Sequence, residues 1–190
     1  MGYGKFVLVG EDKKSLSMIK NTLTANGLIY VGYTQETHNV LRIIRKFSPE
    51  LVIIDVMNKF NELKPFLEAI DEDVLAACIL LLETRNDNVI EFLRNTRIMS
   101  YLTKPVFDDA AMQVVDISTM NFERVLEYES KVRKLNDTLE SRKVVEKAKW
   151  LLVEKEGFTE PEAYEVIKRK SRDNRMPMKE IAEAIILTRG

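Results

Sequence analysis

Histidine and cysteine each occur only once in the 190 residues, as His38 and Cys78. One histidine excludes zinc and catalytic sites that need several histidines, and one cysteine excludes an intrachain disulfide. Cys78 lies inside an apolar run, which favours a small buried hydrophobe over a metal-binding thiol. The chain also lacks both an apolar run of about eighteen residues and a basic leader before Phe6. We therefore expect no transmembrane helix, no signal peptide and a cytoplasmic location.

A strong charge of either sign is also missing, because 29 basic and 30 acidic residues leave a formal net charge of −1. With 45% hydrophobic and 31% charged residues, the composition is typical of a globular protein, long enough for one full domain and a smaller one. Charge alone does not indicate a nucleic-acid ligand. Such a ligand would require positive charge concentrated on one local surface.

The first 105 residues alternate between short apolar runs and stretches with helical spacing. Two runs are continuously hydrophobic, as strands buried on both faces are. This alternation predicts an α/β fold with right-handed crossovers and a doubly wound, five-stranded parallel sheet. The expected strands are Phe6–Val9, Ile29–Val31, Leu51–Ile54, Cys78–Leu82 and Tyr101–Leu102, and the expected helices are Ser15–Ala25, His38–Lys46, Leu63–Ile70 and Asn88–Thr96.

Polar residues follow the ends of four of these strands. Glu11 and Asp12 come after the first strand, Asp55 ends the third, Thr84 follows the fourth and Lys104 follows the fifth. In a doubly wound sheet the functional crevice lies beyond the carboxyl ends of the strands, so we expect these side chains to converge. Clustered carboxylates repel one another unless a cation is present, and oxygen ligands favour Mg²⁺. The metal would make one carboxylate a phosphoryl acceptor, with Lys104 and Thr84 holding the phosphoryl oxygens.

Over residues 4–122 the chain resembles the receiver domains of two-component response regulators. The matching residues, in order, are Glu11-Asp12, Asp55, Thr84, Tyr101 and Lys104-Pro105. The resemblance implies a flavodoxin-like receiver domain at residues 1–122 that a sensor histidine kinase phosphorylates on Asp55. It also implies Mg²⁺ held by Glu11, Asp12, Asp55 and the carbonyl of Met57, and Tyr101 as the aromatic side chain that changes orientation on phosphorylation.

The chain departs from the receiver pattern at three places. The segment Val56–Glu62 lacks the Met-Pro and Asp-Gly residues that usually follow the acceptor, Arg97-Ile98 replaces a Gly-Ala pair, and the bulky Glu83 precedes Thr84. No essential group is missing. These departures nevertheless leave open a degenerate receiver that serves as a dimerisation scaffold, with its acidic residues merely solvated.

A long helix is expected after the sheet, because no proline or glycine occurs between Phe107 and Leu139. Asp108-Asp109 favour the positive end of such a helix. Its apolar residues follow steps of three and four, which is the seam of a coiled coil. We predict a connecting helix at residues 123–140 that pairs two copies of the chain, with a helix lying back on its own receiver as the alternative. The seam residues are Val125, Tyr128, Val132, Leu135 and Leu139.

Residues 141–190 are predicted to form a small bundle of three amphipathic helices. The first runs from near Ser141 to Glu156 and ends at Gly157. Thr159 caps the second, with Pro161 in its first turn and Glu162 at the capping-box position, and Pro177 opens the third. The positions expected to be buried are Val144, Ala148, Leu151, Leu152, Ala163, Val166, Ile167, Met178, Ile181, Ala182 and Ile185.

The same segment resembles the ANTAR family of RNA-binding antitermination modules. The matches are Ala148-Lys149, Leu151-Leu152, Gly157, Glu160, Glu162-Ala163-Tyr164, Met178, Ile181-Ala182 and Ile185-Ile186. The resemblance implies a response regulator that dimerises on phosphorylation and binds paired stem-loops in a leader mRNA. Holding that RNA structure would prevent a transcription terminator from forming. No membrane partner and no small-molecule substrate are implied.

Trp150 stands where the family often has a small residue. On a helical wheel it lies opposite the expected buried stripe, beside Lys143 and Lys147. An exposed tryptophan between lysines could stack on an unpaired loop base of the RNA. Packing of Trp150 against the partner helix or the receiver is the alternative.

Local positive charge is found between Lys168 and Arg175. Such a charge run is usually a solvated face, but the family resemblance makes phosphate contacts plausible here. The expected RNA-contacting residues are Lys149, Trp150, Arg169, Arg172, Arg175 and Lys179.

Three other functions fit the sequence less well or differ only in their control. A DNA-binding regulator needs several base-reading side chains on one face of a recognition helix, whereas the third helix of the bundle is largely apolar. A degenerate receiver controlled by a protein partner would share the same RNA-binding module. An enzyme would need catalytic residues beyond the receiver acids, and we expect no enzymatic activity.

Overall fold

The structure is a computed structural model that describes residues 4–57 and 59–189. The chain divides into two compact units, Met1–Tyr128 and Glu129–Gly190. The first contains the sheet and the second contains a small helical bundle. Among the described residues, no helix is both long and apolar enough to span a membrane.

The first unit is a five-stranded parallel sheet in the order β2-β1-β3-β4-β5. This confirms the predicted doubly wound α/β fold. Val9 pairs with Ile54, and Asp55 pairs with Leu81, so the carboxyl ends of the central strands lie at one edge of the sheet. The strands are β1 (Lys5–Val9), β2 (Ile29–Thr34), β3 (Leu51–Asp55), β4 (Ala77–Leu82) and β5 (Met99–Thr103).

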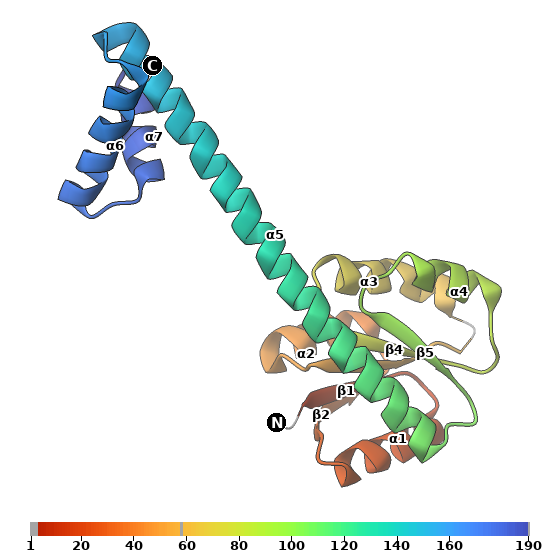
Figure 1. The fold of residues 1–190 in the computed structure, drawn as a ribbon. Coiled ribbons are helices and arrows are strands. Elements are labelled where there is room, and N and C mark those ends of the chain that lie inside the picture. The colour runs from red at the N-terminus through yellow and green to blue at the C-terminus, as the bar shows by residue number, and fades with distance from the viewer. Residues whose placement is uncertain (1–3, 58, 190) are drawn as a thin grey trace. The chain divides into compact units, whose positions relative to one another are not determined.

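Helices cover both faces of the sheet (Figure 1). Helices α3 and α4 lie on one face, and α1 and the start of α5 lie on the other. The Thr22 hydroxyl of α1 donates a hydrogen bond of 2.5 Å to Asp108, which ties α1 to the first turn of α5. The helices around the sheet are α1 (Lys13–Ala25), α2 (Thr37–Phe47), α3 (Phe60–Glu72) and α4 (Asp87–Arg94), followed by the long α5 (Asp108–Glu156).

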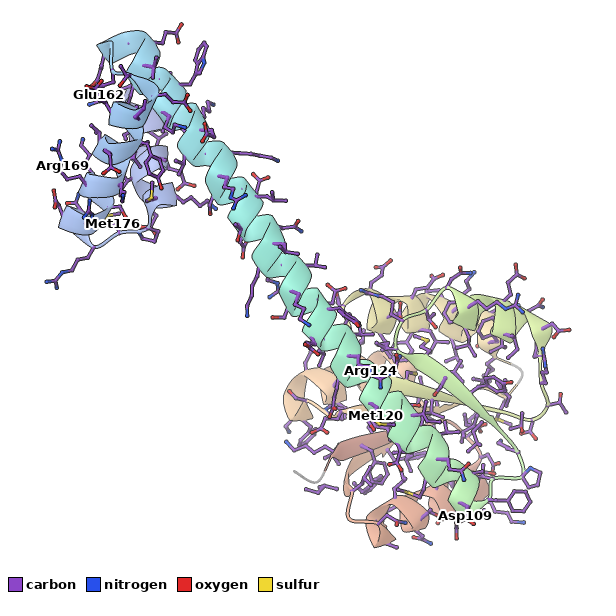
Figure 2. All side chains as sticks on the ribbon, in the orientation of Figure 1. Asp109, Met120, Arg124, Glu162, Arg169 and Met176 are labelled. Atoms are coloured by element: carbon purple, nitrogen blue, oxygen red, sulfur yellow. The ribbon has the colours of Figure 1, made fainter. Side chains whose placement is uncertain are left out.

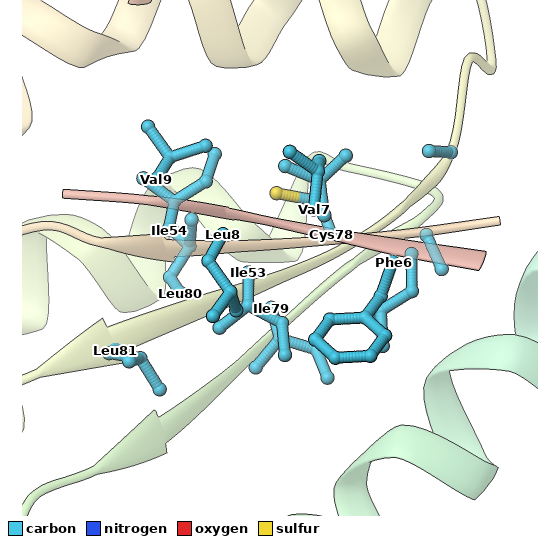
Figure 3. Close-up of a cluster of buried hydrophobic side chains, with 14 of the residues drawn as sticks. Phe6, Val7, Leu8, Val9, Ile53, Ile54, Cys78, Ile79, Leu80 and Leu81 are labelled. Carbon is cyan, nitrogen blue, oxygen red and sulfur yellow. The ribbon is translucent and has the colours of Figure 1, made fainter. Parts of the chain in front are cut away.

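The core of this unit is built from the three central strands. Every residue of β3 and β4 is buried, as their continuous apolar sequences predict, and Figure 3 shows their side chains packed with those of β1. Cys78 is fully buried, and this burial raises the pKa of its thiol. Polar groups of the central strands are therefore confined to their ends, where the candidate site lies.

Arg97-Ile98, which replaces the usual Gly-Ala pair, has a structural role. The buried carboxylate of Asp71, in α3, accepts hydrogen bonds from the backbone N–H groups of Arg97 at 2.8 Å and Ile98 at 3.1 Å. The Arg97 guanidinium also donates to the carbonyl oxygens of Asp71 and Glu72. These contacts fix the entry into β5, the strand that carries Tyr101 and leads to Lys104.

Helix α5 is longer than predicted. It runs without a break from Asp108 to Glu156, over 49 residues. The connecting helix and the first helix of the bundle, which we expected to be separate, are one helix. Gly157 then ends it with a φ of +72°, a left-handed conformation that glycine adopts without a steric penalty.

The second unit packs the end of α5 against α6 (Glu160–Asn174) and α7 (Met178–Arg189). The Glu162 carboxylate accepts hydrogen bonds from the N–H of Thr159 at 2.8 Å and from its hydroxyl at 2.7 Å, at the predicted capping position. Leu151, which we expected to be buried, is only half-buried, whereas Val145 packs on the core. The buried face of α5 is therefore rotated slightly from the face that the helical wheel predicted. The fully packed residues are Ala148, Leu152, Ala163, Ile167, Ile181, Ala182 and Ile185.

Candidate functional sites

The first candidate site surrounds Asp55 at the carboxyl edge of the sheet. Asp55 is 5% exposed. The Lys104 ammonium lies 2.8 Å from its Oδ1 and 2.9 Å from Oδ2 of Asp12. The backbone N–H of Asp12 donates to Oδ2 of Asp55 at 3.2 Å. The structure thus brings together three of the residues predicted from the strand ends.

Asp12 both caps a helix and pairs with Lys104. Its side chain accepts hydrogen bonds from the N–H groups of Lys14 and Ser15 at the start of α1, and from the Ser15 hydroxyl at 2.6 Å. The hydrogen bond from Ser15 and that from Lys104 hold the pKa of Asp12 well below its usual range. Asp12 is therefore a fixed carboxylate.

Lys104 stays protonated although it is largely buried. Burial by itself would lower its pKa, but hydrogen bonds to Asp55, Glu83 and Asp12 outweigh this effect and raise the pKa. Its position follows from the backbone, since the Lys104 N–H donates to the carbonyl of Leu82 at 2.8 Å.

Glu83, which the sequence indicated only as a departure from the receiver pattern, also reaches the site. It is the first residue after β4, and its carboxylate lies 2.7 Å from the Lys104 ammonium. Thr84 follows one position later and is exposed, and no hydrogen bond of its hydroxyl is found among the described residues. The contact predicted between Thr84 and a phosphoryl group on Asp55 is thus not preformed, and the bulk of Glu83 was the signal for this.

Glu11 points to a second lysine that the sequence did not single out. Its carboxylate pairs with the ammonium of Lys59, which lies just before α3, and this pairing raises the pKa of Lys59. Met57, whose carbonyl is the fourth predicted metal ligand, has a left-handed φ of +45° in the same loop. Asn58, part of the atypical loop segment noted in the sequence, lies outside the described residues.

The donors around Asp55 suit a hard cation. They are oxygens, as Mg²⁺ prefers, and Oδ1 of the buried Asp55 forms an ion pair of 2.8 Å with Lys104. A cleft of about 270 Å³ opens beside Asp55, lined by Glu11, Met57 and Lys59 among others. Over the described residues no three acidic, cysteine or histidine side chains converge as a ready-made metal site. If Glu11 is a metal ligand, as predicted, a cation would have to displace Lys59 from it.

Gly10 allows this site to form. A Cβ built at Gly10 would lie 2.5 Å from Cβ of Asp55, and the φ of +139° is one that other residues rarely adopt. The chain can therefore pass from β1 to Glu11 and Asp12 against Asp55 only with glycine at this position.

Tyr101, the predicted switch residue, lies on β5 and is exposed. It lines a shallow apolar groove with Ile90 and Leu93 of α4 and with Val114 and Ile117 of α5. The phenol is thus separate from the cluster around Lys104, at the surface formed by α4, β5 and α5.

In the bundle, the six predicted RNA-contacting residues do not form one patch. Lys149 is 8% exposed and its ammonium binds Glu160 at 2.7 Å and Glu146 at 3.0 Å. These two carboxylates raise the pKa of Lys149, while Lys149 lowers that of Glu160. The pair joins α5 to the first turn of α6, so Lys149 already has a structural role.

The three arginines of the prediction are exposed on or beside α6. Arg169 and Arg172 line a groove of about 360 Å³ together with Phe158, Val166 and the acidic Glu162 and Glu165. Figure 2 shows Arg169 pointing outward from the bundle. Arg175 caps the end of α6 with a left-handed φ of +54°. Lys179 lies in the first turn of α7 and its charge helps to lower the pKa of Glu140, after the larger effect of Lys143. Trp150 is 66% exposed, on the side of α5 away from the bundle core.

Together, a receiver-like α/β sheet with an aspartate and lysine at its carboxyl edge, a long helix and a small bundle define a response regulator with a helical output module. The comparisons with known proteins agree. A model of the ANTAR domain matches residues 133–186. The transcriptional regulatory protein PdtaR of Mycobacterium tuberculosis (strain CDC 1551 / Oshkosh) is 30% identical over 185 residues, which cover 97% of this chain and 90% of PdtaR.

Solved structures support the fold of the first unit. A response regulator from Thermotoga maritima aligns with a TM-score of 0.55 at 18% identity, covering 62% of this chain and 98% of that one. The signal receiver domain of a modulated diguanylate cyclase from Desulfovibrio desulfuricans G20 aligns with a TM-score of 0.54 at 12% identity, covering 63% and 96%. The chain belongs to the family of response regulators that join a receiver domain to an ANTAR domain.

Proposed function

We propose that the protein is a phosphorylation-controlled, dimeric RNA-binding antiterminator of transcription. The observation that carries the proposal is the set of exposed arginines, Arg169, Arg172 and Arg175, on the ANTAR bundle. In a protein with net charge −1, these arginines supply the local positive surface that RNA binding requires. Because antitermination acts on nascent RNA, the proposal places the protein in the cytoplasm.

In the proposed mechanism a sensor histidine kinase supplies the phosphoryl group and Asp55 accepts it. Mg²⁺, when bound by Glu11, Asp12, Asp55 and the Met57 carbonyl, would neutralise charge on the transferring group. Lys104 lies within reach of Asp55 and would hold a phosphoryl oxygen after releasing one carboxylate. Thr84 would have to turn inward to hold another, and Tyr101 would report the change to the surface between α4 and α5.

The proposed dimer forms through helix α5. Val125, the first residue of the predicted seam, packs instead against the receiver core. The other four, Tyr128, Val132, Leu135 and Leu139, are exposed at steps of three and four along this helix, as a coiled-coil seam requires. Two bundles held together can engage two stem-loops of one leader RNA, so the second contact becomes intramolecular and strengthens binding. Stabilising both hairpins would exclude the competing terminator.

The arginines provide the test of RNA binding. Arg169→Ala and Arg172→Ala in the full chain should each weaken binding to an RNA with two small hairpins. Each should also reduce the slope of log affinity against log salt by about one, if each side chain contacts one phosphate. Fluorescence anisotropy of labelled RNA at several salt concentrations measures both quantities. Lys46→Ala, the same charge change on α2 of the receiver, is the matched control, and an equal effect of all three variants would contradict the proposed surface.

A second candidate, the receiver controlled by a protein partner without phosphorylation, is favoured by one observation. Each carboxylate around Asp55 is already paired with a lysine, since Lys104 pairs with Asp12, Asp55 and Glu83 while Lys59 pairs with Glu11, and these two lysines offset half of the negative charge. Such a cluster can be stable without a metal ion or a phosphoryl group. RNA binding would then respond to the partner and not to the state of Asp55.

A further inference from the structure

Trp150 lies on the face of α5 opposite the bundle core. It is two positions from each of the fully buried Ala148 and Leu152, which at about 100° per residue places it roughly on the far side of the helix. It is 66% exposed, so most of its indole is not covered by the bundle. A fully buried aromatic side chain covers about 150–250 Å², and most of that area is still available here for another molecule.

The same face continues the apolar seam of α5. Leu139 and Trp150 are eleven positions apart on one unbroken helix, close to three full turns at about 3.6 residues per turn. Lys143 and Glu146 lie between Leu139 and Trp150 on the same face, at intervals of three or four residues, and Val153 follows Trp150 at an interval of three. We define the pairing stripe as Val132, Leu135, Leu139, Lys143, Glu146, Trp150 and Val153, all of which are exposed.

Lys149 shows why the stripe shifts to Trp150. A strict heptad from Leu139 would pass through Arg142 and Glu146 to Lys149. Lys149 is buried against α6 by its contacts with Glu160 and Glu146, so it cannot face a partner helix. An insertion of four residues in the heptad, a stutter, slightly unwinds a coiled coil and brings Trp150 to the seam instead.

The charges around Trp150 do not favour RNA. Its neighbours three and four positions away on the helix surface are Glu146, Lys147, Val153 and Glu154, all exposed. Because Glu146 is paired with Lys149, this surface carries no net positive charge that would attract a phosphate backbone. The exposed arginines belong to another helix, α6.

The same charges suit a second copy of this chain. In a parallel, in-register pair, Lys143 and Glu146 occupy successive layers with opposite charge. Lys143 pairs with Glu140 and Glu146 with Lys149 within one chain, and in the dimer the exposed Lys143 can exchange Glu140 for Glu146 of the other helix. The layers on either side of this charged pair are apolar: Leu139 precedes it, and Trp150 and Val153 follow it. We propose that Trp150 and Val153 are the end of the dimer seam, beyond a charged layer pair that fixes its register. The inference rests on the proposed pairing of two copies and not on RNA binding.

The only tryptophan of the chain makes the test direct. With the full chain, activated by beryllofluoride and Mg²⁺, Trp150 emission should shift to shorter wavelength as protein concentration rises. The shift should follow the increase from monomer to dimer mass in sedimentation equilibrium, without RNA. Trp150→Glu should weaken the dimer by at least about tenfold, because it replaces a large apolar interface side chain with a charge, while Trp150→Phe should retain it within about threefold.

Two controls separate the possible outcomes. Tyr164→Ala removes another exposed aromatic, on α6, and should leave the dimer unchanged. Circular dichroism should show that the Trp150 and Tyr164 variants are folded, because both of these side chains are exposed. Leu135→Glu should abolish pairing. A dimer lost with Leu135→Glu but kept with Trp150→Glu would overturn this inference and leave the proposed function intact. Emission that changes only on addition of RNA would overturn it in favour of base stacking.

Discussion

At the scale of single residues, two lysines determine the state of the candidate phosphorylation site. Lys104 contacts three carboxylates, and those hydrogen bonds raise its pKa against the opposing effect of burial. Lys59 neutralises Glu11, a predicted metal ligand, from the loop before α3. A divalent cation at Asp55 must therefore compete with a lysine that the protein itself supplies.

Removing Lys59 should strengthen the binding of Mg²⁺. Lys59→Ala frees Glu11, so the affinity of the full chain for Mg²⁺ should rise by about two- to fivefold, the range expected for loss of an exposed ion pair. Isothermal titration calorimetry with Mg²⁺ alone measures this. Lys64→Ala, which removes a lysine paired with Glu68 on α3, is the control and should change nothing. Unchanged or weaker binding in Lys59→Ala would show that Lys59 does not compete with the cation.

The limits of the sequence are also clearest at single residues. Asp12, Asp55 and Lys104 could be predicted, because in a doubly wound sheet the strand ends alone bring them to one edge. Glu83 and Lys59 could not be assigned to the site, since the direction of a side chain in a loop depends on backbone conformation that apolar patterning does not encode. Lys149 was predicted as an RNA contact from the family pattern, and the structure shows it paired with two carboxylates.

At the scale of elements, the strands were predictable and the length of α5 was misjudged. The continuous apolar runs of β3 and β4 give both their position and their burial. We divided α5 near Ser141 because the apolar seam ends there, but the end of a seam indicates a change of packing partner and not the end of a helix. The helix-breaking residues are Pro105 before the helix and Gly157 after it, and no proline or glycine occurs between them.

The joint between α5 and α6 should depend on pH through Glu160. Because pairing with Lys149 lowers the pKa of Glu160 below its ordinary value of 4.5, the pair stabilises the bundle above that value. This contribution is lost as the pH falls through the lowered pKa. Glu160→Gln should therefore reduce the free energy of unfolding at pH 7, and the difference from the unmodified chain should vanish in strong acid.

Chemical denaturation followed by circular dichroism at a series of pH values measures this difference. Glu183→Gln removes an exposed carboxylate of α7 for which no ion pair is found among the described residues, and it serves as the control. A deficit in Glu160→Gln that persists unchanged into strong acid would contradict an electrostatic origin of the joint.

At the scale of the whole molecule, we propose that each part of the chain has a separate task. The receiver provides a carboxylate whose charge can change, α5 provides a surface for pairing, and the bundle provides exposed arginines. One bundle is small and nearly neutral in charge, so a single copy should bind RNA weakly. Pairing two copies raises the local concentration of the second bundle and can increase affinity by about a hundredfold or more without new contacts.

The central claim is that the state of Asp55 controls RNA binding. Its most direct test is the affinity of the full chain for a two-hairpin leader RNA, measured with and without beryllofluoride and Mg²⁺, for the unmodified chain and for Asp55→Ala. We predict that the phosphoryl mimic tightens binding by the unmodified chain at least about tenfold and has no effect on Asp55→Ala. Equal affinities with and without the mimic would contradict phosphorylation control and favour a receiver governed by a protein partner.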